Sequence, residues 1–348
     1  MIKRDSSLDL LKTISMLLVI VIHLSNYYCR NAIDILSTNF IFSVVYDGLA
    51  RICVPLFFMI SGVVILNGKY DGRKYIARIV KFILVLAFWS IVYYLWDAFY
   101  MHYEYNLVSD FFNIFFIPMK IHLWFMYPII GLYIIAPFIQ KMVNNLDKKL
   151  ENLFIFLWMG FSGGVYVLIL ILEELDVVAK VVYPLPMLQE TYWMGYFITG
   201  YILYKRIQPI KGERKYNKIL VLSFIISMTL TIGATIKYSI SEGEFFQDYY
   251  AYRSLFIIVS SLSFFCYVII NSDRILKKPV EKAAKILVTY SFGVYLSHLM
   301  FYNILVKEFD VLKLNGTYAV PLFTVLIFFV SLSFTYLLKK IPILKNVV

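Results

Sequence analysis

Three ionisable residues, Asp9, Lys12 and His23, interrupt an apolar stretch near the start of the chain. A histidine ring has an ordinary pKa of about 6.5, so it can take a proton from a hydroxyl group near neutral pH as a general base. An ionisable group inside hydrocarbon costs roughly 2.5–3.5 kcal/mol on insertion scales, so such side chains are expected to face a polar interior. Residues 8–28 are therefore predicted to form a membrane-spanning helix with one functional face.

Lys12 and His23 are predicted to share that face. They are eleven positions apart, which corresponds to about three helical turns and to about 16 Å along the axis. Lys12 would then lie near one membrane surface and His23 beyond the midplane. The alternative is that Asp9 and Lys12 lie at the interface and reach to water, while His23 is a hydrogen-bonded packing residue.

A second ionisable residue within an apolar stretch is Arg51, which lies about ten residues, or about 15 Å, into the second predicted span. An arginine cannot lose its proton, so it needs a carboxylate, backbone carbonyls, water or an anionic ligand. In an active site it would stabilise an oxyanion. The alternative is an internal ion pair with Asp9 or Asp47. Pro55 and the Ser61–Gly62 pair are expected to bend or loosen this span.

Basic residues crowd the segment that follows: Lys69, Arg73, Lys74, Arg78 and Lys81. Lys74 and Arg78 are four positions apart and share a helix face. One interpretation is that these charges only set the orientation of the chain in the membrane. The other is that they bind a ligand with several phosphate groups.

Two further motifs place histidines beside aromatic residues. In the fourth predicted span, His122, Trp124 and Tyr127 indicate either an aromatic belt at the membrane surface or a platform for a sugar ring. In the ninth, Tyr295 and His298 share a helix face. His298 is either a site residue or a histidine hydrogen-bonded to a neighbouring helix.

The composition is that of a membrane protein, with 61% hydrophobic residues, 16% charged residues and a mean hydropathy of +0.75. Soluble proteins have about 25% charged residues. The 348 residues leave no room for a second domain beside about ten spans of roughly 20 residues, so residues 1–348 are expected to form a single domain. The three scattered cysteines predict neither a disulfide framework nor a zinc site, and no metal is expected.

The predicted fold is an all-α bundle of about ten transmembrane helices, with both termini in the cytoplasm. The predicted spans are residues 8–29, 41–67, 79–100, 123–142, 153–172, 188–204, 218–237, 252–271, 286–306 and 318–338. With this topology 24 lysines and arginines fall in cytoplasmic segments and seven in outer ones, as expected for cytoplasmic loops. This asymmetry also accounts for the net charge of +11, so no nucleic-acid partner is needed to explain it.

Five motifs in this order resemble the acyltransferase 3 family, and the resemblance covers essentially the whole chain. They are Lys12-x10-His23, the R-x-x-V-P-L-F-F-M-I-S-G run from Arg51 to Gly62, the step from Lys74 to Arg78, H-L-W-F-M-Y from His122 to Tyr127, and S-F-G-V-Y-L-S-H ending at His298. The family has an arginine where this chain has Lys12. The charge is kept, but the bidentate guanidinium is lost.

The resemblance implies a membrane O-acyltransferase of the bacterial cytoplasmic membrane that moves an acetyl group from acetyl-CoA to an envelope carbohydrate or lipid-linked sugar. Some family members carry an extracytoplasmic hydrolase-like domain, and none is predicted here. The expected catalytic residues are His23, Arg51 and Lys12. The expected acetyl-CoA-binding residues are Arg73, Lys74 and Arg78. Those expected to bind the acceptor are His122, Trp124, Tyr127, Tyr295 and His298.

Two rival interpretations of the buried charges remain. In the first, they form the pathway of a polysaccharide or lipid-linked sugar exporter that catalyses no acyl transfer. In the second, the protein is a sensory or structural partner in an envelope assembly complex. Acyl transfer or acetyl-CoA hydrolysis by the pure protein, without a gradient, separates an enzyme from both. The sequence leaves open whether the protein forms a homodimer.

Overall fold

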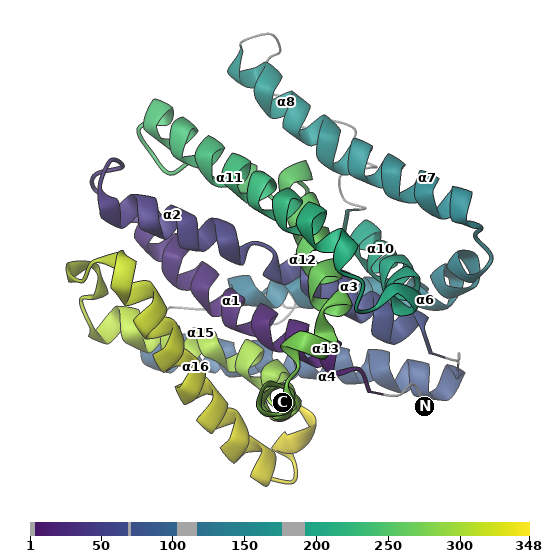
Figure 1. Ribbon diagram of the computed structural model, residues 1–348. Helices are drawn as coiled ribbons and strands as arrows, with labels where there is room; N and C mark the ends of the chain where they lie inside the picture. Colours follow the sequence, from purple (N-terminus) through teal and green to yellow (C-terminus); the bar gives the residue numbers. More distant parts are fainter. Residues whose placement is uncertain (1–3, 69–70, 103–116, 176–191) are drawn as a thin grey trace.

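The computed structural model describes residues 4–68, 71–102, 117–175 and 192–348, and over these residues the chain is helical without strands (Figure 1). The α-helices are α1 (Ser6–Arg30), α2 (Thr38–Ala50), α3 (Cys53–Leu66), α4 (Gly72–Trp96), α6 (Met126–Asn144), α7 (Lys148–Trp158), α8 (Val165–Glu174), α10 (Tyr192–Ile207), α11 (Asn217–Glu242), α12 (Leu255–Ile270), α13 (Ser272–Ile275), α14 (Lys278–Leu287), α15 (Ser291–Glu308) and α16 (Gly316–Lys340). Shorter 3-10 or π segments are η1 (Asp97–Met101), η2 (Ile121–Phe125), η3 (Met159–Gly164), η4 (Gln208–Ile210), η5 (Arg214–Tyr216), η6 (Asp248–Tyr250), η7 (Val311–Lys313) and η8 (Leu344–Asn346).

Eight helical segments among the described residues are long and apolar enough to cross a membrane. They are Ser6–Arg30, Thr38–Leu66, Gly72–Met101, Ile121–Asn144, Lys148–Glu174, Arg214–Glu242, Asp248–Ile270 and Gly316–Lys340. Large apolar side chains on α4, α11 and α16 are exposed, as expected of surfaces that face lipid. The chain is therefore an all-α, multi-pass membrane protein.

The other two predicted spans correspond to α10 and α15. Both are helices, but α10 has 16 described residues and α15 has 18, with polar residues along its length. Residues 188–191 of the sixth predicted span lie outside the described residues. Ten of the 16 residues of α10 are buried inside the bundle. The number of about ten crossings stays a prediction.

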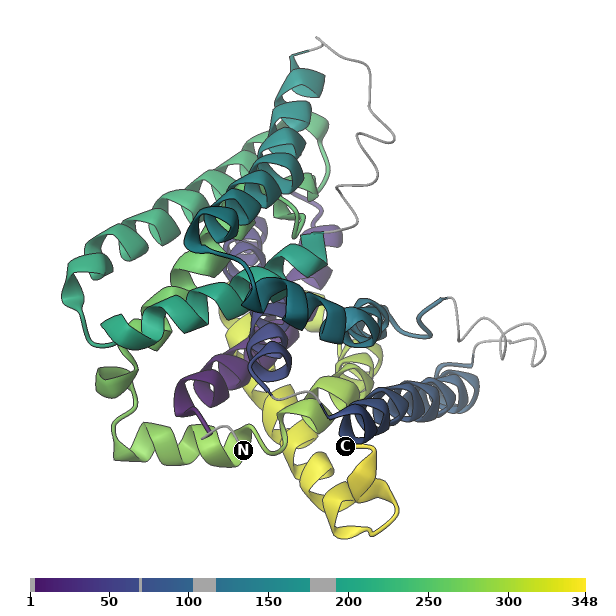
Figure 2. The same cartoon turned by 90° about the vertical axis from the view of Figure 1, so that its right-hand side faces the viewer.

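Helix α1 runs through the bundle and packs against α2, α3, α15 and α16 (Figures 1 and 2). Its first turn is capped by Asp5, whose carboxylate accepts a hydrogen bond from the Ser7 N–H at 2.8 Å. Arg4 donates to the Lys285 carbonyl at 3.0 Å, and Lys339 near the end of α16 donates to the Thr289 carbonyl. The N-terminal end of α1 and the C-terminal end of α16 therefore lie at the same end of the bundle.

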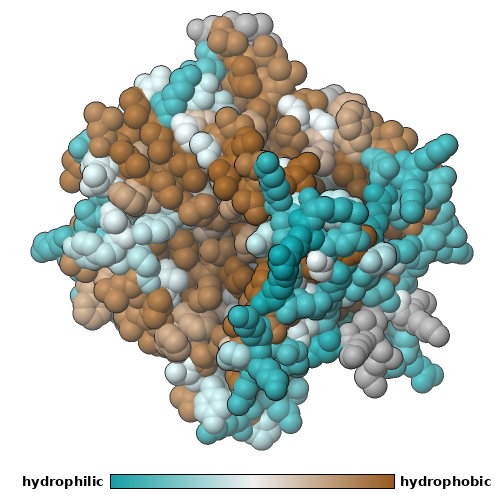
Figure 3. Space-filling model, viewed as in Figure 1, coloured by the Kyte–Doolittle hydropathy of each residue, from teal (hydrophilic) through white to brown (hydrophobic). Residues whose placement is uncertain are grey.

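The surface is polarised in the way a membrane protein requires. Figure 3 shows that hydrophobic residues cover much of the visible face, while hydrophilic side chains gather on the part where α13 lies in Figure 1. The predicted topology assigns several basic segments to the cytoplasm, among them residues 141–149, 205–218 and 274–285. Their location on the cytoplasmic side stays a prediction.

The second predicted span is two helices that meet at a break beside Arg51. A helix would need a hydrogen bond from residue 55 to the carbonyl of residue 51, and Pro55 has no N–H to donate. Pro55 instead occupies the first turn of α3, where N–H groups have no intrahelical partner. The predicted bend is therefore present, and it lies at Arg51.

Helices α3 and α10 pack closely through glycines. A Cβ atom on Gly62 would lie 1.8 Å from the Phe197 carbonyl oxygen, and one on Gly200 would lie 2.5 Å from the Met59 Cα. Both are closer than atoms can approach, so only glycine fits. Gly62 thus brings α10 against α3 rather than loosening the span.

We predict that Gly62→Ala lowers the melting temperature of the detergent-solubilised protein. The added methyl meets a backbone carbonyl that cannot move aside, and overpacking costs about 1–3 kcal/mol or more. The matched control is Gly233→Ala in α11, where a Cβ would have no atom within 4 Å. That control should melt at the same or a higher temperature. Equal melting of Gly62→Ala and wild type would contradict the close packing of α3 and α10.

Candidate active site

A cavity of about 560 Å³ lies where α1, the break between α2 and α3, η2, the η6–α12 loop and α15 converge. One helix face of α1 supplies Val19, His23, Asn26 and Arg30 at successive turns. Arg30 also donates to the Gln247 side chain at 2.9 Å. The cavity therefore lies toward the C-terminal end of α1, away from the chain's N-terminus.

Three histidines from distant parts of the sequence meet at this cavity. The ring centroids of His23 and His298 are 5.2 Å apart, and those of His298 and His122 are 5.1 Å apart. His23 and His122 line the cavity, whereas His298 is 1% exposed and packs between them. The sequence predicted a site role for each residue but not their mutual contact.

Hydrogen bonds define the tautomers of the two buried histidines. A carbonyl oxygen only accepts, so His298 Nδ1 must carry the proton that it shares with the Tyr295 carbonyl at 2.6 Å. By the same reasoning, His122 Nε2 donates to the Leu296 carbonyl at 3.2 Å. The remaining atoms, His298 Nε2 and His122 Nδ1, are buried and have no hydrogen-bond partner. Each neutral ring therefore presents an unused lone pair inside the site.

Backbone carbonyls hold η2 against α15. The Tyr93 hydroxyl also donates to the Leu296 carbonyl, at 2.8 Å, and the Tyr295 hydroxyl donates to the His122 carbonyl. The Leu296 carbonyl thus holds the His122 ring through Nε2, while the Tyr295 hydroxyl holds the His122 backbone carbonyl. His122 is 3% exposed, so it is an interior residue of the site and does not belong to a surface belt.

Arg51 forms a bidentate ion pair with Asp47 at the wall of the cavity. The Arg51 Nε and Nη2 atoms lie 3.0 and 2.9 Å from the two Asp47 carboxylate oxygens, and Asp47 is fully buried. The Asn26 amide donates to the same carboxylate at 3.3 Å. The Arg51 guanidinium also lies 5.0 Å from the Tyr250 ring centroid and 5.9 Å from that of Tyr252. The predicted alternative of a pair with Asp47 is confirmed, and Arg51 also lines the cavity.

A second ion pair borders the cavity beside His122. Lys120, which lines the cavity, lies 2.7 Å from the carboxylate of buried Asp97. Asp97 begins the π-helical segment η1, and such segments are frequent at functional sites. The pair ties the end of α4 to the start of η2.

Five of the predicted site residues line this cavity: His23, Arg51, His122, Trp124 and Tyr295. His298 contacts three of them, His23, His122 and Tyr295, from outside the cavity. Tyr127 does not line the cavity, and its hydroxyl donates to the Ile117 carbonyl at 3.3 Å.

Lys12 lies on the same face of α1 as His23 but below the cavity, seven residues before Val19. Asp9 pairs with Arg4 at 2.6 Å, and Lys12 forms no ion pair within 4 Å in the described part of the chain. Lys12 therefore lies in the N-terminal half of α1 and is not one of the residues that line the cavity.

The predicted donor-binding residues Arg73, Lys74 and Arg78 lie on the first two turns of α4 and are exposed. Asp71 caps this helix and pairs with Lys74 at 3.1 Å. Both side chains of the pair face solvent, so it is weak and leaves Lys74 accessible to a ligand.

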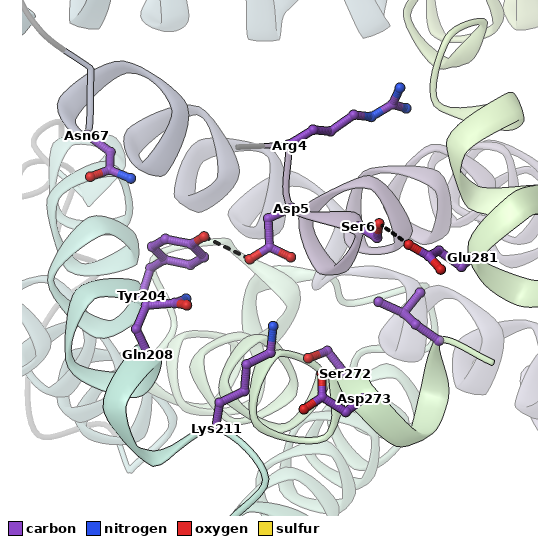
Figure 4. A pocket seen from close by; sticks show the side chains of 11 residues that line it. Arg4, Asp5, Ser6, Asn67, Tyr204, Gln208, Lys211, Ser272, Asp273 and Glu281 are labelled. Carbon is purple, nitrogen blue, oxygen red and sulfur yellow. Dashed lines mark hydrogen bonds between the residues drawn. The ribbon is translucent and has the colours of Figure 1, made fainter. Parts of the chain in front are cut away.

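A second cavity, of about 660 Å³, lies at the other end of α1, near the N-terminus (Figure 4). Its lining includes the carboxylates of Asp5, Asp273 and Glu281, and Figure 4 shows Lys211 pointing toward Asp5. Burial acts to raise the pKa of Asp5, but hydrogen bonds from Ser7 and Tyr204 outweigh it and hold that pKa below its ordinary value. The lining also holds two cations, Arg4 and Lys211, but the three carboxylates outnumber them, which makes this cavity a poorer site for phosphate groups than a purely basic surface.

In the described part of the chain, no group of three or more His, Cys, Asp or Glu side chains has the arrangement to hold a metal ion. The three histidines contact one another through their ring faces and edges instead.

Comparison with known families gives one match: the family model described as the acyltransferase domain, Acyl_transf_3, matches residues 5–340. The chain belongs to this family. Comparisons with curated proteins and with solved structures found no matching chain. The match covers every residue that lines the cavity with the histidines, and all but Arg4 of those that line the second cavity.

The acyltransferase also has site residues that sequence reasoning missed. Trp193 and Tyr252 stack against Trp124, with ring centroids at 4.9 and 6.0 Å. Tyr302 lies 6.2 Å from the His23 ring centroid. Tyr302 follows Tyr295 and His298 on α15 at helical spacing, which was an available signal. Nothing in the local sequence distinguishes Trp193 or Tyr252 from ordinary aromatic residues at a membrane surface.

We predict that Asp47→Ala destabilises the acyltransferase by about 3–5 kcal/mol and abolishes its activity, because it leaves the Arg51 charge buried without a partner. The double variant Asp47→Ala with Arg51→Met should regain most of the stability, since no unpaired charge remains, but it should stay inactive. Thermal melting and acyl transfer in detergent measure the two effects.

The control for this pair is Asp310→Ala, which removes an exposed ion pair with Lys313 and should change neither quantity. Recovery of activity in the double variant would show that the Arg51–Asp47 pair serves the fold alone.

Proposed function

We propose that this acyltransferase is an O-acetyltransferase of the bacterial cytoplasmic membrane. It moves the acetyl group of cytoplasmic acetyl-CoA to a hydroxyl of an envelope carbohydrate or lipid-linked sugar. The observation that carries the proposal is the cavity in which the His23 ring and the Arg51 guanidinium both face the same space. A base for a hydroxyl proton and a cation for a developing oxyanion are the two groups that this reaction needs.

The reaction begins when the acceptor hydroxyl oxygen attacks the thioester carbonyl carbon and His23 takes the hydroxyl proton. Negative charge then develops on the former carbonyl oxygen, and the Arg51 guanidinium stabilises it. Collapse of this intermediate breaks the carbon–sulfur bond. His23 returns its proton to the thiolate, so an O-acetyl ester and free CoA leave, and the enzyme regains its starting charge.

His298 and His122 support the base from behind. The His298 ring packs against the His23 ring, and the His122 ring packs against that of His298, so the two histidines hold the His23 ring in place. Tyr295 holds the backbone of His122, and Trp124 forms part of the wall that receives the acceptor. We propose that His122, Trp124, Tyr295 and His298 together also position the acceptor.

The donor is proposed to bind at the cytoplasmic end of the bundle. Its nucleotide carries several phosphate charges, which match the exposed cations Arg73, Lys74 and Arg78 better than the carboxylate-lined second cavity does. The pantetheine arm then passes along α1 toward His23. Lys12, on that face of α1 below the cavity, supplies positive potential along this path.

We predict that His23→Ala lowers the transfer rate by about 10²–10⁴-fold, the usual effect of losing a positioned base. Affinity for acetyl-CoA should stay close to that of wild type, because the base acts after the donor binds. The assay follows acetyl-CoA turnover by the pure protein in detergent, without a gradient. His102→Asn is the matched control, because His102 is exposed and does not line the cavity. Activity above about a tenth of wild type would remove His23 from the mechanism.

We predict that Lys74→Ala with Arg78→Ala weakens acetyl-CoA binding several-fold, and that the difference from wild type shrinks as salt is added. Calorimetry at low and high salt measures it. The control variant, Lys277→Ala with Lys278→Ala, removes two exposed charges from α14 and should bind the donor as wild type does. Equal affinity of the two double variants would mean that the α4 cluster only sets the topology.

A further inference from the structure

Two further cavities adjoin the active-site cavity and share lining residues with it. One, of about 580 Å³, is lined by Trp124, Pro128, Tyr192, Trp193 and Tyr252. The other, of about 350 Å³, includes Arg51, Gln247, Tyr252 and Arg253 in its lining. Tyr252 lines all three cavities, and Trp124 lines the active-site cavity and the first neighbour. The three cavities therefore adjoin one another at these shared side chains, and we call the part lined by Trp124, Trp193 and Tyr252 the aromatic groove.

Flat aromatic faces dominate this groove. The Trp193 ring centroid lies 4.9 Å from that of Trp124 and 5.9 Å from that of Tyr252. All three side chains are partly exposed. The face of an aromatic ring carries negative potential and attracts the weakly positive C–H groups of a sugar ring. The polar edge of such a sugar would face the amide and charged groups along the same groove.

Those polar groups are held in place by the protein. Arg30 donates to the Gln247 amide oxygen at 2.9 Å, which orients the amide toward the groove rim. The Arg253 guanidinium lies 4.4 Å from the Tyr166 ring centroid, and the Tyr166 hydroxyl donates to the Asp248 carbonyl at 2.9 Å. Aromatic walls with a few oriented polar groups are typical of sites that bind small polar ligands. An acyl chain or lipid tail could make no hydrogen bond with these polar groups.

The aromatic groove is separate from the reacting position. Trp193 and Pro128 do not line the cavity that contains His23. One sugar ring therefore cannot both stack on Trp193 and present its hydroxyl to His23. An acceptor that uses both places has at least two sugar units.

We propose that Trp124, Trp193 and Tyr252 form a second acceptor subsite, which binds a sugar unit next to the one that is acylated. The enzyme then acts on an oligosaccharide or polysaccharide chain in preference to a single sugar. This inference rests on the proposed function, because it requires transfer to a sugar hydroxyl. The second subsite specifies the minimum length of the acceptor, at least two sugar units, and names the residues that recognise that length.

The test uses the pure protein in detergent with acetyl-CoA and a ladder of acceptors one to six sugar units long. The ladder is made by partial depolymerisation of alkali-treated envelope polysaccharide from a strain that lacks the gene. For wild type, kcat/KM should rise between one and three units and then level off. In Trp193→Ala the rise should be lost, which lowers kcat/KM for the longer acceptors about tenfold while the single unit reacts as before.

Two variants control for folding and for aromatic surface in general. Trp193→Phe keeps a ring in the groove and should keep most of the rise. Phe138→Ala removes a 77% exposed ring of α6 outside the groove and should behave as wild type. Acetyl-CoA binding by calorimetry should be the same in all variants, which shows that Trp193→Ala is folded.

The outcomes separate the two levels of the argument. Transfer by wild type that is equally efficient for every acceptor length, or equal loss for all lengths in Trp193→Ala, would overturn the second subsite and leave the proposed function standing. Binding of acetyl-CoA without transfer to any acceptor of the ladder would overturn the proposed carbohydrate acceptor, and the subsite with it.

Discussion

A permanently charged guanidinium within a membrane-spanning segment is the constraint on which the site depends. Arg51 cannot be neutralised by losing its proton, so its surroundings must supply the opposite charge. Asp47 does so from one turn earlier, with Asn26 of α1 donating to the same carboxylate. Pro55 breaks the helix at the same place. The charge, its partner and the break together bring α1, α2 and the tyrosines before α12 to one wall of the cavity.

Much of the helical architecture could be predicted from the sequence because a bilayer imposes long apolar runs. The first predicted span, 8–29, and the observed Ser6–Arg30 differ by two residues at one end and one at the other. The prediction is weaker where a helix is covered by protein. Helix α15 carries His298, Asn303 and Lys307 and need not be apolar throughout, because other helices surround much of it.

The site was predictable along each helix but not between helices. Periodicity correctly placed His23 on the α1 face that lines the cavity and Tyr295 beside His298. It gave no information about lateral neighbours, so the contact of His122 with His298 and of Trp193 with Trp124 could not be inferred. It also gave the separation of about 16 Å along the axis between Lys12 and His23, but it did not show that only His23 borders the cavity, since residues on one face can border different spaces. The close approach of α10 to α3 through Gly62 has the same origin, because a glycine does not indicate which backbone it faces.

The Leu296 carbonyl accepts hydrogen bonds from both Tyr93 and His122, and this has a consequence for how the site can change during evolution. A carbonyl is present in every amino acid, so the leucine side chain can be exchanged for another apolar group of similar volume without losing the acceptor. Substitution at position 296 would therefore be tolerated even though its backbone orients a histidine of the site. A comparison of side chains among sequences would therefore not reveal that the Leu296 carbonyl orients His122.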